Sequence, residues 1–192
     1  MNFIRKQIAL LQVVIFFVSV TGFTQTAYAK SVYAIIDHLY DIIGAYKIQG
    51  DQIEYQTQMQ APQHATRAID LAMDSNSCCI FVTYEYSNII EIMNAKTMTN
   101  EGSVTATGAS NLAGIVFDEA RQKLYVVARE TNHLFVYLWN ATTKTLTPDG
   151  NNPKTLSELG GDGAYGISLD TANGHLYVTN YTNIIHYYDT DD

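Results

Sequence analysis

Polar side chains able to hold a ligand or transfer protons lie between the apolar runs of this sequence. Carboxylate and amide oxygens are the ligands that calcium prefers, and carboxylates and imidazoles serve as general acids and bases. Residues of these types, with two arginines, stand at Asp37, His38, Asp41, His64, Arg67, Glu85, Asn111, Arg129, Glu130, Asp162 and Asn180. The candidate ligand-binding residues among them are His38, His64, Arg67, Asn111, Arg129, Asp162 and Asn180.

Calcium is the one cofactor that this set could hold. Asn111, Asp162 and Asn180 would supply the oxygen ligands if their side chains converge. The same three residues also suit turns, because Asn and Asp side chains bond nearby backbone amides and tolerate left-handed geometry. Turn chemistry accounts for all three, so we expect no metal site and keep calcium as the alternative.

The sequence contains no recognisable catalytic motif. Segment 166–169, Gly-Ile-Ser-Leu, ends in Leu where a nucleophile elbow needs Gly. Segment 160–163, Gly-Gly-Asp-Gly, lacks the lysine and the following helix of a phosphate-binding loop. Cys78 and Cys79 are adjacent and have no companion pair, so they indicate neither a zinc site nor a redox centre. We therefore expect no catalytic residue.

The chain that must position these residues consists of short β runs separated by turn residues. The runs are rich in β-branched and aromatic residues, and several alternate apolar with polar side chains, as half-exposed strands do. We expect strands at 32–36, 42–48, 53–59, 69–73, 79–84, 89–93, 102–106, 112–117, 123–128, 133–139, 144–147, 167–169, 175–180 and 184–188. With no helix between them, consecutive strands form antiparallel meanders.

One pattern recurs three times along these runs. An aspartate closes a strand and an aromatic residue follows seven positions later, in the pairs Asp74 and Phe81, Asp118 and Tyr125, and Asp170 and Tyr177. A second mark is an asparagine directly before the third strand of each unit, at Asn88, Asn132 and Asn183. We expect these Asp and Asn residues to have structural turn roles, and the aromatic residues to pack between neighbouring units.

The period of this repeat predicts the fold. The aspartates are 44 and 52 residues apart, and a four-stranded unit of about 40 to 50 residues is typical of a propeller blade. We therefore expect an all-β fold, a β-propeller of four-stranded antiparallel blades, with a partial blade at 30–60, blades at 61–107 and 108–158, and a partial blade at 159–192. That makes about three and a half blades, while rings have about four to eight. We expect a partial propeller; a small self-sufficient domain is the alternative.

The N-terminus predicts export. Residues 1–29 combine a basic start at Arg5 and Lys6, an apolar stretch at 8–20 and a small-residue cleavage site at 27–29, the pattern of a secretory signal peptide. Without it, nine basic residues face 19 acidic ones, and the formal net charge changes from -8 to -10. Nucleic acids and anionic lipids need a basic surface. We expect a secreted, periplasmic or cell-surface protein with no nucleic-acid partner and no membrane span after signal removal.

The segment Leu-Tyr-Val-Thr-Asn at 176–180, preceded by Ala-Tyr-Gly-Ile at 164–167 and by Asp170, resembles the YVTN family of β-propeller repeats. That family is akin to NHL-repeat and lactonase-like propellers, and segments 80–84 and 124–128 match its motif more loosely. The resemblance covers about residues 32–189. It implies an exported, surface-associated or scaffold propeller, in some relatives a lactonase or other hydrolase, and a chain roughly twice this length.

Two functions follow as hypotheses. The first is a non-catalytic binding or scaffold module that contacts an unknown protein or small-molecule ligand through the face on which the candidate residues gather. Loops on a rigid scaffold commonly carry such a function. The alternative is a lactonase-like or other hydrolase, calcium-dependent if Asn111, Asp162 and Asn180 share one axial pocket.

Overall fold

The computed structural model describes residues 30–37, 42–49, 51–60, 67–159, 163–181 and 185–190. These residues form fifteen strands and one short 3-10 turn, η1 (Ser157–Leu159). No part of them builds a helix with the length and hydrophobicity that crossing a membrane requires. The predicted all-β class is confirmed.

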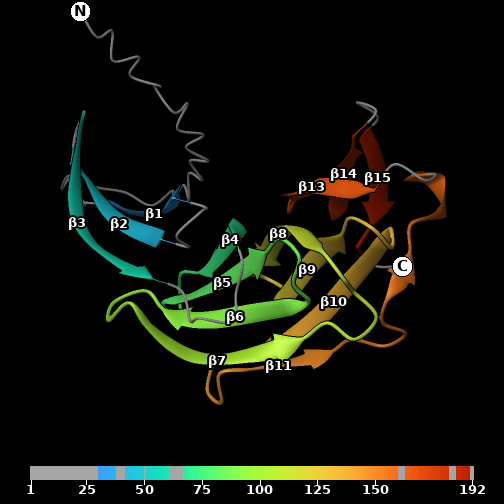
Figure 1. Cartoon of the computed structure of the whole chain (residues 1–192), viewed down its shortest axis with the longest axis horizontal. Coiled ribbons are helices and arrows are strands. Elements are labelled where there is room, and N and C mark those ends of the chain that lie inside the picture. Colours follow the sequence, from blue (N-terminus) through green and yellow to red (C-terminus); the bar gives the residue numbers. More distant parts are fainter. Residues whose placement is uncertain are drawn as a thin grey trace, which may run out of the picture.

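The strands form four antiparallel sheets, each of which runs in chain order apart from the short β12 (Figure 1). The first sheet contains β1 (Lys30–Asp37), β2 (Ile42–Gln49) and β3 (Gln52–Gln60). The second contains β4 (Ala68–Asp74), β5 (Cys79–Tyr84), β6 (Ile89–Asn94) and β7 (Thr99–Thr105). The third contains β8 (Leu112–Asp118), β9 (Lys123–Ala128), β10 (His133–Asn140) and β11 (Thr145–Pro148), and β12 (Lys154–Thr155) also pairs with β10. The fourth contains β13 (Ala164–Asp170), β14 (His175–Asn180) and β15 (Ile185–Asp189).

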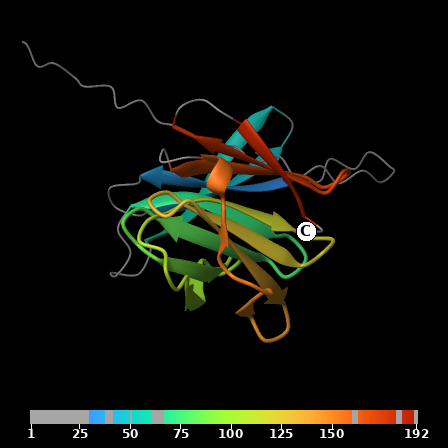
Figure 2. The same cartoon turned by 90° about the vertical axis from the view of Figure 1, so that its right-hand side faces the viewer.

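The sheets are arranged side by side as the blades of a partial propeller (Figures 1 and 2). The first strands of successive sheets meet, β4 against β8 and β8 against β13. Among the described residues the first sheet has no such strand: β1 carries Val32-Tyr33-Ala34, which matches Leu124-Tyr125-Val126 on β9, the second strand of its blade. The described residues thus supply strands two to four of one blade, two complete blades, and strands one to three of a fourth.

The repeated aspartates form the turns between the first two strands of a blade. Asp118 Oδ1 accepts hydrogen bonds from Ala120 N and Arg121 N, at 2.9 and 3.1 Å. Asp74 and Asp170 accept corresponding bonds from Asn76 N and Ala172 N. The residue four positions after each aspartate has a positive φ, and only the third repeat has glycine there, Gly174 with φ 70°. A carboxylate that binds the turn amides thereby reverses the chain within four residues.

Strand boundaries differ from the prediction at several ends, where polar residues or a glycine join the ladder. β7 begins at Thr99 instead of residue 102 and ends at Thr105, because Thr99 and Asn100 pair through their backbones with Asn94 and Met93. β13 begins at Ala164, three residues earlier than expected, and Ala164 pairs with Asn180. Backbone pairing does not require the apolar side chains by which the strands were predicted.

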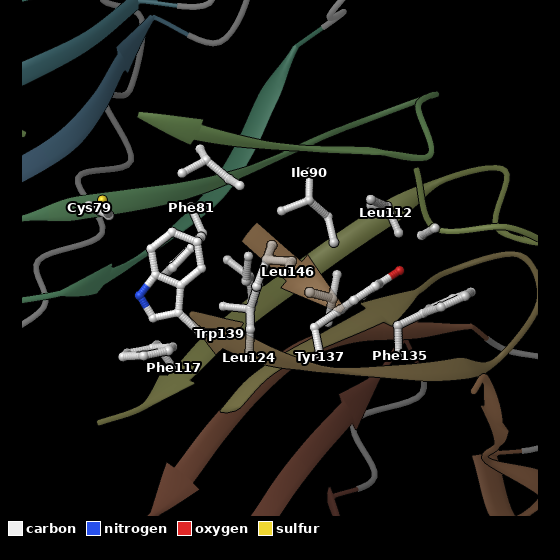
Figure 3. Packing of buried hydrophobic residues seen from close by; sticks show 14 of the residues in the cluster. Cys79, Phe81, Ile90, Leu112, Phe117, Leu124, Phe135, Tyr137, Trp139 and Leu146 are labelled. Carbon is white, nitrogen blue, oxygen red and sulfur yellow. The ribbon is translucent and has the colours of Figure 1, made fainter. Parts of the chain in front are cut away.

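The hydrophobic core is divided among the three junctions between neighbouring blades. At the junction of the second and third blades, the ring of Phe81 lies 5.3 Å from that of Phe117 and 4.9 Å, edge to face, from that of Trp139 (Figure 3). Trp139 Nε1 donates to Asp74 Oδ2 at 2.9 Å, so this junction also satisfies a fully buried carboxylate. Large aromatic rings contribute most of the area buried at such contacts.

The repeated aromatic residue is buried at two junctions and exposed at the third position. Phe81 and Tyr125 are buried between blades, as predicted. Tyr177 is more than a third exposed, contrary to the prediction. The reason is positional: no described sheet covers the face of the fourth blade on which Tyr177 stands.

Candidate functional site

Two arginines and a glutamate meet where neighbouring blades adjoin at one end of their sheets. Arg67 precedes β4, Glu85 follows β5, and Arg129 follows β9. Arg129 Nη1 lies 2.8 Å from Glu85 Oε1, and Arg67 Nη1 lies 3.4 Å from Glu85 Oε2. Backbone bonds hold these loops, since Glu85 N donates to Arg67 O and Arg129 N donates to Asn111 O. One carboxylate therefore links guanidinium groups from two successive blades.

Three tyrosines surround the arginines. The Arg129 guanidinium lies 4.8 Å from the ring centre of Tyr165 and 5.1 Å from that of Tyr181, within the range of a cation–π contact. Arg129 Nη2 also donates to the hydroxyl of Tyr181. Arg67 lies 5.8 Å from the ring centre of Tyr86. We call Arg67, Glu85, Tyr86, Arg129, Tyr165 and Tyr181 the arginine–tyrosine surface.

A glycine allows this surface to assemble. A Cβ on Gly163 would lie 2.5 Å from the carbonyl oxygen of Arg129, and Gly163 has φ 70°. The backbone that leads into β13 can therefore approach Arg129 only with glycine at this position. The approach brings Tyr165, two residues further on, beside the guanidinium.

Asn111 and Glu130 border the arginine–tyrosine surface. Asn111 Oδ1 accepts a hydrogen bond from Tyr86 N at 3.1 Å, and Asn111 Nδ2 donates to Glu130 Oε1 at 3.3 Å. Ser110 Oγ donates to the second oxygen of Glu130 at 2.8 Å. The amide oxygen that would have to bind calcium is thus engaged with the backbone of the β5–β6 turn.

The arginine–tyrosine surface offers hydrogen-bond donors and aromatic contact area to solvent. Arg67 has a half-exposed side chain, and Tyr86, Tyr165 and Tyr181 are exposed. Guanidinium groups offer fixed N–H donors for a carboxylate, and tyrosines supply rigid contact area with a polar end. Within the described ranges, no three His, Cys, Asp or Glu side chains gather in a way that could hold a metal ion.

The structure brings together only part of the predicted set. Arg67, Asn111 and Arg129 meet at the surface, and Glu85 and Glu130 join them. Asn180 is buried, and its amide donates to Leu159 O at 3.5 Å.

Two of the asparagines predicted to have turn roles lie in the described residues. Asn132 accepts a hydrogen bond from Ala164 N and has φ 49°. The backbone carbonyl of Asn88 accepts a hydrogen bond from Ala106 N. The predicted residues His38, His64, Asp162 and Asn183 lie outside the described residues.

Sequence reasoning missed the tyrosines of this surface. Tyr86 directly follows Glu85, and Tyr181 directly follows Asn180, so both stand beside residues that the turn pattern selects. Tyr86 and Tyr181 follow the predicted strands instead of lying within them, and this position could have indicated that they are exposed beside the candidate residues. Tyr165 lies on β13 and offers no such signal, because its contact with Arg129 depends on the packing of two blades.

A carboxylate inside the blade junction was also missed. Asp70 lies on β4 and accepts hydrogen bonds from Leu71 N at 2.9 Å and, across the junction, from Ile115 N on β8 at 3.0 Å. Burial raises the pKa of the Asp70 carboxyl to about 6, although both backbone bonds act to lower it. Gly166 holds the corresponding place on β13, since it pairs with Thr179 as Asp70 pairs with Thr83. Gly114 stands at this place on β8, four residues before Asp118, so Asp70 is the carboxylate at this position among the described first strands.

Comparison with solved structures supports the propeller fold. A chain in the crystal structure of a nidogen–laminin complex matches 86% of this chain and 59% of its own length, with 18% identity and a TM-score of 0.61. A candidate 6-phosphogluconolactonase from Bacteroides uniformis matches 83% of this chain and 47% of its own, with 15% identity and a TM-score of 0.66. A functionally unknown protein from Desulfotomaculum acetoxidans matches 84% and 49%, with 11% identity and a TM-score of 0.64.

These likenesses concern architecture alone, because the sequence identities are only 11% to 18%. No family model matches the sequence, and no curated protein matches it significantly. The chain spans about half the length of the solved chains that it matches, between 47% and 59% in the three cases above. The structure shares its fold with proteins that differ in function.

Proposed function

We propose that the chain is an exported propeller of the YVTN type that binds a protein partner through the arginine–tyrosine surface and catalyses no reaction. In this proposal residues 1–29 are the signal peptide, and the remaining chain acts outside the cytoplasm, in the periplasm or at the cell surface. The observation that carries the proposal is the group of exposed tyrosines around the guanidinium groups of two blades. Tyrosine and arginine dominate binding energy at protein interfaces.

The charge of the surface indicates what the partner presents. Arg67 and Arg129 both contact the carboxylate of Glu85. The contact of Arg67, at 3.4 Å, is longer and therefore weaker than that of Arg129, at 2.8 Å. A guanidinium in this position can form a paired hydrogen bond with an incoming carboxylate. The partner therefore places an acidic side chain near Arg67 and apolar or aromatic groups over Tyr86 and Tyr181. A propeller neighbour crystallised in a nidogen–laminin complex is consistent with partner binding by this architecture.

The alternative is a lactonase-like hydrolase with calcium at the axis. It would draw on Asn111, Asp162 and Asn180, of which Asn111 has its amide oxygen bonded to Tyr86 N. A protein that binds calcium only when folded melts at a higher temperature in its presence. We expect the melting temperature to stay unchanged in calcium at about 1 mM, and a rise of several degrees would favour the hydrolase instead.

Affinity capture tests the binding function. A tagged chain is incubated with a surface-protein extract of the producing cells, the captured protein is identified by mass spectrometry, and its Kd is then measured with purified components. Arg67→Ala and Tyr181→Ala should each weaken binding by about 10-fold or more, since truncation of a central Arg or Tyr costs about 2 kcal/mol. Both side chains are exposed, so neither variant should disturb folding.

The matched control is Thr142→Ala, an exposed residue in the turn between β10 and β11, at the other end of the sheet from Arg129. It should leave the Kd unchanged. Equal affinity of wild type, both surface variants and the control would exclude the arginine–tyrosine surface as the binding site. Absence of any captured protein at micromolar chain concentration would exclude the binding function itself.

A further inference from the structure

The turn between β10 and β11 has a close counterpart in the second blade. Residues 140–145, Asn-Ala-Thr-Thr-Lys-Thr, match residues 94–99, Asn-Ala-Lys-Thr-Met-Thr, between β6 and β7. Asn140 Oδ1 accepts hydrogen bonds from Thr142 N and Thr143 N, at 3.0 and 3.1 Å. Asn94 Oδ1 accepts corresponding bonds from the backbone N–H groups two and three positions further on, at 2.9 and 3.1 Å. The side-chain oxygen of the asparagine therefore stabilises the turn in both blades.

The two turns differ at their third residue and at the nitrogen of the asparagine amide. Thr142 stands where the second blade has a lysine, so segment 140–142 is Asn-Ala-Thr, the acceptor pattern for an N-linked glycan. Asn94 is partly buried, and its Nδ2 donates to Glu101 Oε1 at 2.8 Å. Asn140 is exposed, and no group among the described residues accepts a hydrogen bond from its Nδ2. Of the two turns, the one in the third blade thus has both the pattern and an accessible amide nitrogen.

The sequence contains one other acceptor pattern, Asn-Tyr-Thr at 180–182. Asn180 is only 7% exposed, and its amide donates to Leu159 O. A glycan is bulky and strongly hydrated, so a glycan on Asn180 would require this side chain to leave its buried position. The folded chain therefore exposes the acceptor asparagine of the first pattern and buries that of the second.

We propose that Asn140, and not Asn180, carries an N-linked glycan in the exported protein. This inference rests on the export that forms part of the proposed function, because N-linked glycans are a modification of secreted chains. The step joins Asn140 Nδ2 to the anomeric carbon of a saccharide that is carried on a lipid phosphate. The bond between that carbon and the phosphate oxygen breaks, and one amide proton leaves with the lipid phosphate.

The position of the turn leaves room for a glycan. The third blade lies between the second and the fourth, since β8 contacts both β4 and β13, and Asn140 is exposed with both neighbouring blades in place. Asn140 ends β10, whereas Arg129 adjoins the start of that strand, where His133 pairs with Ala128. The glycan therefore stands at the end of the sheet opposite the arginine–tyrosine surface, and its loss should not change the affinity for the partner.

Mass spectrometry of the protein from its producing cells tests the proposal. The chain is purified from the cells and from the medium and digested with trypsin, which places Asn140 in peptide 130–144 and Asn180 in the peptide that begins at Thr155. Peptide 130–144 should gain the mass of a glycan attached to Asn140, and the other peptide should show no gain. An exported chain with an unmodified Asn140, or with a glycan on Asn180, would overturn the proposal.

N-terminal sequencing of the same samples reports export independently of the glycan. A chain that begins at Lys30 and carries no glycan would contradict this inference and leave the proposed function standing. A chain that keeps residues 1–29 and stays in the cytoplasm would overturn the glycan and the export together.

Variants of the turn, produced in the same cells, separate the glycan from the fold. Thr142→Ala removes the acceptor pattern but keeps the bonds to Asn140 Oδ1, because their donors are backbone N–H groups. It should abolish the mass gain, whereas Thr142→Ser should retain it. Thr143→Ala is the matched control: Thr143 is an exposed residue of the same turn outside the pattern, and its variant should stay glycosylated. A mass gain that survives Thr142→Ala, or one that Thr143→Ala abolishes, would show that the pattern at 140–142 does not direct the modification.

Discussion

Replacing Asp70 with asparagine should remove a pH-dependent loss of stability. In the folded protein burial raises the pKa of this carboxyl to about 6, whereas its ordinary value is 3.8. The folded state therefore holds the proton more tightly than the unfolded state, and the ionised form is the one that folding disfavours. The contribution of the protonated Asp70 carboxyl to the free energy of unfolding is fully present below pH 3.8 and is lost as the pH rises through 6.

The size of the effect follows from the shift. One pKa unit corresponds to about 1.4 kcal/mol, so the rise of about two units amounts to about 3 kcal/mol between pH 3.8 and pH 7. Asparagine has nearly the same shape and keeps an oxygen for the bond from Leu71 N or Ile115 N, but it does not ionise. The amide group that replaces the second oxygen adds a cost that does not vary with pH.

The assay is urea unfolding at one protein concentration from pH 4 to pH 7.5, for wild type and Asp70→Asn. Other carboxylates titrate in both proteins, so their contribution cancels in the difference. The free energy of unfolding of Asp70→Asn should rise relative to wild type by about 2 to 3 kcal/mol across this range. Asp170→Asn is the control: a hydrogen bond from Asn173 is the main cause that lowers the pKa of Asp170, so that carboxyl titrates below the window.

A difference between wild type and Asp70→Asn that stays constant from pH 4 to pH 7.5 would refute this reasoning. It would mean that water reaches the carboxyl or that the bond from Ile115 N outweighs burial. A difference that falls with rising pH would reverse the sign and show that folding favours the carboxylate.

Three further substitutions probe the blade junctions and turns, each followed by thermal and urea unfolding. Phe81→Ala should lower stability by about 3 to 5 kcal/mol, because it opens a cavity beside Trp139; a loss below about 1 kcal/mol would mean that the junction is loosely packed. Trp139→Phe should cost about 1 to 3 kcal/mol, because the buried Asp74 carboxylate loses its 2.9 Å bond, and an unchanged urea midpoint would contradict that. Gly174→Ala should cost about 1 kcal/mol, since φ is 70° and a Cβ would lie 3.0 Å from Thr190 Oγ1; a gain in stability would disprove the strain.

Part of the candidate site could be predicted because turns bring their own residues to one end of a sheet. Glu85 and Arg129 follow second strands, and Arg67 and Asn111 precede first strands, so antiparallel pairing alone places all four at the same end. The contact of Arg129 with Tyr181 joins residues 52 positions apart on neighbouring blades. No local pattern shows which side chains of two blades will touch.

The sequence by itself determined the strands, the turns and the period of the repeat. These depend on contacts within a few residues, such as the bonds from Ala120 N and Arg121 N to Asp118, which form whichever blade lies alongside. The tertiary structure decided which faces are covered. Phe81 and Tyr177 occupy the same place in the repeat, yet Phe81 is buried and Tyr177 is exposed, because burial depends on a neighbouring sheet that the local sequence does not specify.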